Sequence, residues 1–132
     1  MHVTGFIAAD AKYRMEIDAE GHALVADEGP SLGGAGAGPS PFALVLAGLA
    51  ACTGVTLRMY AERHDWADLA VRVELSLRLG GGRPQISRRV EVQGAPNEAG
   101  VARLRDIVER TPVTLALKSG FEIATTLEPE PA

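Results

Sequence analysis

The chain has 132 residues, of which 46% are hydrophobic and 23% are charged, the usual balance of a soluble globular domain. This length fits a single domain spanning residues 1–132. The net charge is −4, from 13 basic and 17 acidic residues. Because nucleic-acid-binding proteins normally carry a basic patch, this charge and the scattered basic residues argue against that class.

Cysteine usage and the N-terminus predict a location in the cytoplasm. Cys52 is the only cysteine, so the intrachain disulfides that stabilise small secreted domains are impossible here. The first residues also lack the basic segment followed by an apolar segment that marks a signal peptide.

The chain begins with short alternating segments that predict strands. Residues 3–7 form a first candidate, residues 13–17 alternate apolar and charged side chains, and His22–Ala26 returns after a turn at Gly21.

A glycine run at 33–38 follows these strands. It contains neither G-x-G-x-x-G nor G-K-[ST], and prolines 39 and 41 lack the N–H groups that would bind an anion. We interpret it as a flexible or tightly turned loop.

A long helix is predicted from Pro41 to about Arg63. Ser40 can cap it, and a proline suits the first turn. No charged residue or histidine occurs from Gly29 to Leu57. The apolar part, residues 42–57, contains glycine and threonine and is shorter than the ~20 residues of a membrane span, so we do not expect a membrane protein.

A helix that is apolar on every face must be buried on every face. A chain of this size has little material left to surround such a helix, so we infer an obligate homodimer in which the helix packs against its partner's copy. Close approach would be permitted by the small residues on the helix, which are Ala47, Gly48, Ala50, Ala51 and Gly54.

The second half of the chain predicts a hairpin, two helices and a last strand. Residues 71–79 and 86–93 alternate with period two around a Gly-Gly-Gly-Arg-Pro turn. Asn97 can cap a helix over 98–110, and Thr111-Pro112 can start a shorter one that ends at Gly120. Apolar residues from 121 to 127 suggest a final strand. The element order indicates an α+β fold.

Cys52 is the remaining candidate for chemistry. The three histidines are isolated and no G-x-S-x-G motif is present, so we expect no metal site and no bound cofactor. A buried cysteine is most often a small packing residue. A reactive thiolate would need a nearby cation, which Arg14, Arg58 or an arginine of the partner subunit could supply, although Arg58 is not on the Cys52 face.

Residues 32–66, LGGAGAGPSPFALVLAGLAACTGVTLRMYAERHDW, resemble the central-helix signature of the OsmC/Ohr family. The resemblance implies an intertwined homodimer in which antiparallel sheets wrap two long central helices. It also implies a thiol peroxidase that reduces organic hydroperoxides. In such enzymes the cysteine matching Cys52 attacks the peroxide, a second cysteine forms a disulfide with it, and an arginine and a glutamate assist. Arg14 is the nearest match to that arginine.

The sequence departs from this family pattern at several positions. Thr111 stands at the second-cysteine position, Ala43 or Phe42 at the glutamate position, and Thr114-Leu115 where a His-Arg pair often follows. The first hypothesis is therefore a hydroperoxide reductase with one working cysteine, which needs an external thiol reductant. The alternative is a non-catalytic protein of this fold that binds a small apolar ligand or a partner, with Cys52 as a packing residue.

Overall fold

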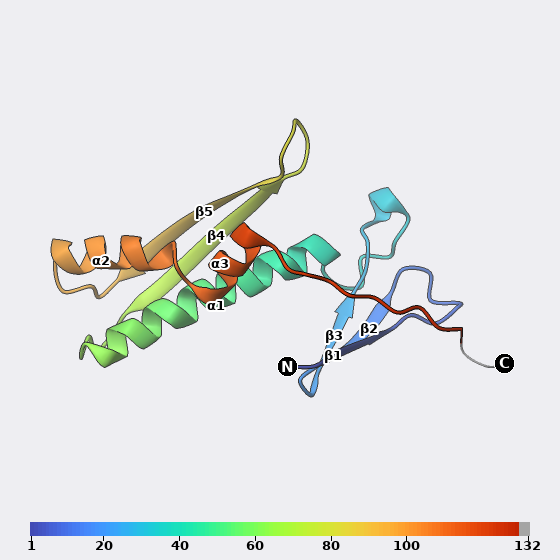
Figure 1. Ribbon diagram of the computed structural model, residues 1–132, viewed down its shortest axis with the longest axis horizontal. Helices are drawn as coiled ribbons and strands as arrows, with labels where there is room; N and C mark the ends of the chain where they lie inside the picture. The colour runs from blue at the N-terminus through green and yellow to red at the C-terminus, as the bar shows by residue number, and fades with distance from the viewer. Residues whose placement is uncertain (130–132) are drawn as a thin grey trace. The chain divides into compact units, whose positions relative to one another are not determined.

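The computed structural model describes residues 1–129, and its contacts divide the chain into two compact units, Met1–Gly48 and the remainder from Leu49. Three strands precede a long helix, and a two-stranded hairpin and two shorter helices follow it (Figure 1). The predicted α+β class is confirmed.

The first unit contains a three-stranded antiparallel meander. Its strands are β1 (Val3–Phe6), β2 (Met15–Ala19) and β3 (His22–Ala26), with β2 in the centre. The turn between β2 and β3 places Gly21 at a φ of 88°, a left-handed conformation that glycine adopts without strain. The predicted strands and turn are therefore present.

The glycine-rich segment of this unit folds tightly around the buried side chain of Asp27. The carboxylate accepts the backbone N–H of Glu28 at 2.7 Å and that of Ala37 at 3.0 Å. A side chain at Gly34 would collide with the Glu28 carbonyl, and one at Gly38 would collide with the Val25 carbonyl. The loop is thus tightly turned, and its amides bind a carboxylate of the chain itself.

Helix α1 (Pro41–Arg63) begins and ends where the sequence predicts. The Oγ of Ser40 accepts the N–H of Ala43 at 3.4 Å and caps the helix. Its buried residues recur at every fourth position and form one stripe: Leu49, Thr53, Leu57 and Ala61. Within one chain, other apolar positions of the helix stay exposed, such as Val55 at 52% and Met59 at 49%. By length and composition alone the helix could also cross a membrane.

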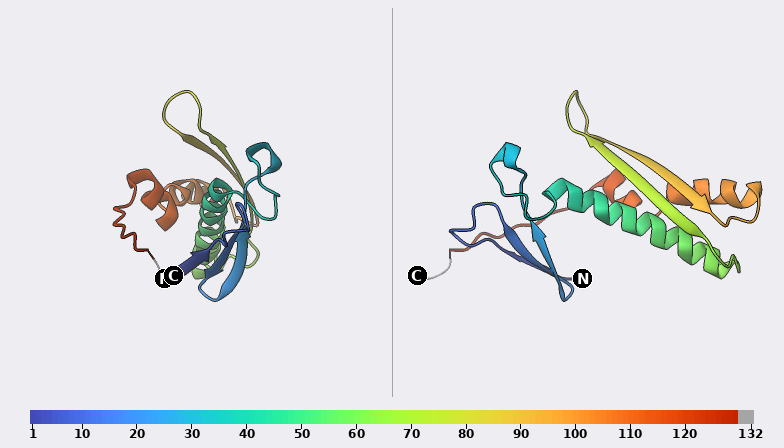
Figure 2. Two further views of the ribbon diagram at one scale, coloured as in Figure 1. Left: turned by 90° about the vertical axis from the view of Figure 1, so that its right-hand side faces the viewer. Right: turned by 180° about the vertical axis from the view of Figure 1, so that it is seen from behind.

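The second unit packs the buried stripe of α1 against the hairpin and α2 (Figure 2). The hairpin consists of β4 (Ala70–Arg78) and β5 (Gln85–Gln93). The helices are α2 (Glu98–Val108), capped by the Asn97 side chain, and α3 (Pro112–Ser119). The core consists of Leu57, Ala61, Leu69 and Leu104. Each of these elements was predicted to within a few residues.

The predicted last strand is wrong. Residues 120–129 form no strand, and their apolar side chains are exposed, with Phe121 at 70%, Ile123 at 85% and Leu127 at 90%. A strand needs the backbone of a neighbouring strand as its hydrogen-bond partner. The apolar residues Phe121, Ile123 and Leu127 suggested a strand, but among the described residues no strand pairs with this segment.

Candidate active site

Cys52 lies in the middle of α1 with a half-buried side chain. Its Sγ accepts the backbone N–H of Val113 at 3.5 Å and lies 3.9 Å from Oγ1 of Thr56. Val113 is in the first turn of α3, where unpaired N–H groups and the helix dipole favour negative charge. The N-terminus of α3 therefore places a hydrogen-bond donor at the Cys52 sulfur. The N-terminus of α1 lies too far along the helix from Cys52 for its dipole to act on the sulfur.

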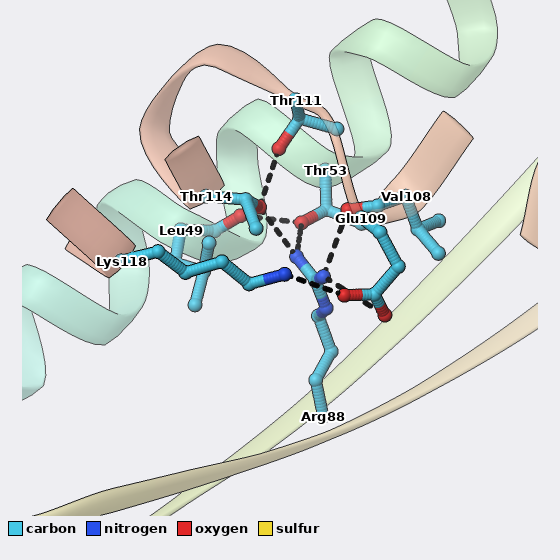
Figure 3. A network of polar contacts seen from close by, with 8 residues as sticks. All are labelled: Leu49, Thr53, Arg88, Val108, Glu109, Thr111, Thr114 and Lys118. Atoms are coloured by element: carbon cyan, nitrogen blue, oxygen red, sulfur yellow. Dashed lines mark hydrogen bonds and ion pairs between the residues drawn. The ribbon is translucent and has the colours of Figure 1, made fainter. Parts of the chain in front are cut away.

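Arg88 of β5 lies beside this region, and its side chain is only 12% exposed. Its Nη1 donates to Oγ1 of Thr53 at 3.0 Å and to Oγ1 of Thr114 at 2.9 Å, while Nη2 donates to the carbonyl of Val108 at 2.8 Å. Nη2 also lies 3.9 Å from the Glu109 carboxylate. One guanidinium thus joins β5, α1, α3 and the C-terminal end of α2 (Figure 3).

Buried threonine hydroxyls complete this network, which consists of Arg88, Thr53, Thr111 and Thr114. Thr53 donates onward to the carbonyl of Leu49 at 2.7 Å, and the hydroxyls of Thr111 and Thr114 lie 2.6 Å apart (Figure 3). Within residues 1–129, every buried side-chain nitrogen and oxygen has a hydrogen-bond partner. A fully satisfied polar network of this kind makes its surroundings rigid, so it fixes the segments on either side of Cys52.

Sequence reasoning did not identify Arg88 as a site residue, although a signal was present. Arg88 alternates in phase with Ile86, Val90 and Val92, whereas Arg89 and its in-phase neighbours point outward. A charged residue on the apolar face of a half-buried strand must find polar partners inside the protein. The threonines that provide them come from two distant helices, which the strand pattern alone could not indicate.

Thr111 lies where the family resemblance places a second cysteine. It is completely buried and precedes by two residues the Val113 amide that contacts Cys52. Thr111 is the N-cap residue of α3, but its hydroxyl makes no capping hydrogen bond, because it pairs with Thr114 instead. The position at which the resemblance places the second cysteine therefore holds a buried hydroxyl rather than a thiol.

The two arginines considered as activators make other contacts. Arg58 donates from its Nε to the carbonyl of Leu69 at 2.9 Å. Arg14 belongs to the first unit, where it forms an exposed ion pair with Glu16 at 2.8 Å. The pairing of Arg14 with Cys52 stays a prediction.

His64 directly follows Arg63, the last residue of α1. Its ring stacks on Tyr60 with 4.0 Å between the centroids, and its Nδ1 lies 2.9 Å from the Tyr60 carbonyl. Among the residues that the structure describes, no three His, Cys, Asp or Glu side chains come together in a way that could hold a metal ion.

Several solved structures share this fold. An OsmC-like protein from Mycoplasma pneumoniae is 22% identical, with 89% of this chain and 86% of that chain covered and a TM-score of 0.68. An organic hydroperoxide resistance protein OsmC from Legionella pneumophila is 22% identical, with coverages of 89% and 90% and a TM-score of 0.62. An OsmC-like protein of unknown function from Vibrio cholerae is 11% identical, with coverages of 87% and 91% and a TM-score of 0.64.

Sequence comparison assigns the family. No curated protein gave a significant match. The family model described as OsmC-like protein matches residues 33–126, which include the glycine-rich loop, α1, the hairpin, α2 and α3. The chain therefore belongs to the family of OsmC-like proteins.

Proposed function

We propose that this protein is a thiol-dependent reductase of organic hydroperoxides in which Cys52 is the sole redox-active group. The observation that carries the proposal is the half-buried Cys52 sulfur that accepts the Val113 N–H at the N-terminus of α3. A donor in this position stabilises negative charge on the sulfur, and the thiolate is the nucleophilic form of cysteine. The name of the Legionella relative supports this class of substrate.

The proposed reaction needs an external thiol. The Cys52 thiolate attacks the outer peroxide oxygen, the O–O bond breaks, and the alkoxide leaves as an alcohol after taking a proton. Cys52 is then a sulfenic acid. One small thiol condenses with it to give a mixed disulfide and water, and a second releases Cys52 as a thiol with formation of the small-molecule disulfide. A reducing compartment such as the cytoplasm supplies these thiols.

The external thiol is required because of Thr111. In members with two cysteines, the resemblance implies that the second one forms the disulfide. Here that position is a buried threonine whose hydroxyl pairs with Thr114. No other cysteine exists in the chain.

The same proposal includes a homodimer formed through α1. Its apolar positions away from the buried stripe, including Val55 and Met59, are about half exposed in the single chain. A groove of about 670 Å³ runs between this side of α1 and β4, and its wall includes the small residues Ala50, Ala51 and Gly54. Small residues permit close packing of helices, so a second copy of α1 is the occupant that fits.

Intact-mass measurement tests the proposed chemistry. The protein is mixed with a stoichiometric amount of cumene hydroperoxide, with and without a sulfenic-acid trap, and Cys52→Ser is the matched control. We expect the wild type to gain an oxygen atom rapidly, the trap to capture it, and the control to stay unchanged. Cumyl alcohol should be released together with this gain of oxygen, and a small thiol should then restore the original mass with release of water.

The alternative function is ligand binding without catalysis. It is favoured by the Cys52 contacts, since the polar groups that contact its sulfur are the Val113 amide and the Thr56 hydroxyl rather than an arginine. Failure of the wild type to gain oxygen faster than Cys52→Ser would exclude the reductase and leave this second function.

A further inference from the structure

A cavity of about 360 Å³ lies within the second unit, between α1, the turn end of the hairpin and α3. Its volume falls within the usual range of small-molecule sites, ~300–1,000 Å³. Cys52 does not line it, so an inference drawn from the cavity does not rest on the proposed peroxide chemistry.

The charges around this cavity are predominantly positive. Arg83, Arg88 and Lys118 line it together with one carboxylate, that of Glu109, which leaves an excess of two positive charges in a protein whose net charge is −4. A hydrogen bond from Lys118, reinforced by the charges of Lys118 and Arg88, holds the pKa of Glu109 below its ordinary value. A concave wall with charge of one sign concentrates ions of the opposite sign.

Arg88 forms the fixed part of this charged wall. The threonine hydroxyls of its network and the Val108 carbonyl hold the guanidinium in place. A donor group already held in position loses little conformational entropy when it binds a ligand. Arg83 and Lys118 lie nearer to the solvent and can adjust to the ligand.

Glu109 shows how a carboxylate can occupy this wall. Its carboxylate lies 2.9 Å from the Nζ of Lys118 and 3.9 Å from Nη2 of Arg88 (Figure 3). The side chain is 61% exposed, so it is free to swing into solvent. An incoming carboxylate can therefore replace it between Lys118 and Arg88.

Apart from Thr114, the remaining lining is apolar. Leu49, Ile86 and Leu117 contribute hydrocarbon surface next to the charged groups. A ligand for this cavity must therefore combine a negative head with a hydrocarbon part. We propose that the cavity binds a small organic carboxylate with an apolar tail, whose head replaces the Glu109 carboxylate.

Titration calorimetry of the full-length protein tests this proposal with sodium octanoate as the probe and 1-octanol as its uncharged counterpart. We expect octanoate to bind with a Kd on the order of 1 mM, as its few heavy atoms allow, and octanol to bind at least about fivefold more weakly because it lacks the charge. Equal binding of both probes, or no binding of octanoate, would overturn the proposal.

Three variants and one control locate the site. Arg83→Gln and Lys118→Gln should each weaken octanoate binding about fivefold, since each removes a positive charge from the cavity. Glu109→Gln should strengthen binding, because it removes the competing carboxylate. Arg89 lies on the opposite face of β5, so Arg89→Gln should bind octanoate as tightly as the wild type does. Unchanged affinity in Lys118→Gln and Glu109→Gln contradicts the proposal.

Discussion

At the scale of single residues, Arg88 has a large predicted effect on stability. Replacing it with leucine leaves the buried hydroxyls of Thr53 and Thr114 without their donor, so the free energy of unfolding should fall by about 3 kcal/mol. Arg89→Leu, on the exposed face of the same strand, should change it by less than about 0.5 kcal/mol. Urea unfolding at a fixed protein concentration measures both, and similar losses in the two variants would refute the role of the network.

A second residue prediction concerns acid and Asp27. The backbone N–H of Ala37, with those of Glu28 and Ala35, holds the pKa of Asp27 below its ordinary value of 3.8. A lowered folded-state pKa means that the carboxylate stabilises the fold above that ordinary value and loses its effect as pH falls through the folded-state pKa. Asp27→Asn should therefore have a lower Tm than the wild type at pH 7.

The gap in Tm between wild type and Asp27→Asn should narrow as the pH falls below 3.8. Asp18→Asn is the control, because its carboxylate accepts a single exposed N–H from Gly21. Scanning calorimetry from neutral to acidic pH measures these differences. A gap that is the same at every pH would show that the carboxylate charge does not matter.

Thr111→Cys should supply the missing second thiol. Thr111 is buried two residues before the Val113 amide that contacts the Cys52 sulfur. After one addition of hydroperoxide, this variant should lose two hydrogen atoms in intact mass, as an intrachain disulfide requires, instead of keeping an added oxygen. Thr111→Cys combined with Cys52→Ser should form no such disulfide. A lasting sulfenic acid in the single variant would show that the two positions cannot pair.

The residues of the site were only partly predictable from the sequence. Cys52 and the Thr111 position followed from the family resemblance, because they lie in continuous motifs. The hydrogen bond between Arg88 and Thr114 joins residues that are 26 positions apart in the sequence. A strand pattern predicts which way a side chain points, whereas the partner it meets depends on how the helices pack.

At the scale of elements, the stripe on α1 holds the second unit together. Leu57 is completely buried in the core with Leu69 and Leu104. Leu57→Ala should lower the free energy of unfolding by roughly 3 kcal/mol, because it removes apolar contacts and leaves a cavity. Leu115 on α3 is 49% exposed, so Leu115→Ala should cost under about 1 kcal/mol. Equal losses in urea unfolding would contradict this assignment of the core.

Local signals explain why most elements were predictable. Ser40, Asn97 and Gly120 mark helix ends because helix capping depends only on residues that are close in the sequence. Period-two alternation marked both strands of the hairpin. The segment from 121 to 127 has apolar residues at 121, 123 and 127 but forms no strand. Strand formation depends on a partner backbone, and the sequence of one segment carries no information about that partner.

At the scale of the whole molecule, the proposed dimer makes stability depend on concentration. If folding is coupled to association, Tm must rise with protein concentration. Val55→Glu places a charge on the exposed side of α1, so it should yield a monomer in light scattering and remove the concentration dependence. Ser87→Glu, on the outer face of β5, should remain dimeric. A monomeric wild type would refute the dimer.

The hydrogen bond from the Val113 amide to the Cys52 sulfur also provides an internal spectroscopic reporter. An amide proton bound to sulfur changes its chemical shift when that sulfur gains an oxygen or a second sulfur. One backbone resonance in a nitrogen-15 spectrum would therefore follow the redox state of Cys52 in real time, with no dye attached. The same peak would distinguish a resting thiol, an oxidised sulfur and a mixed disulfide within one sample.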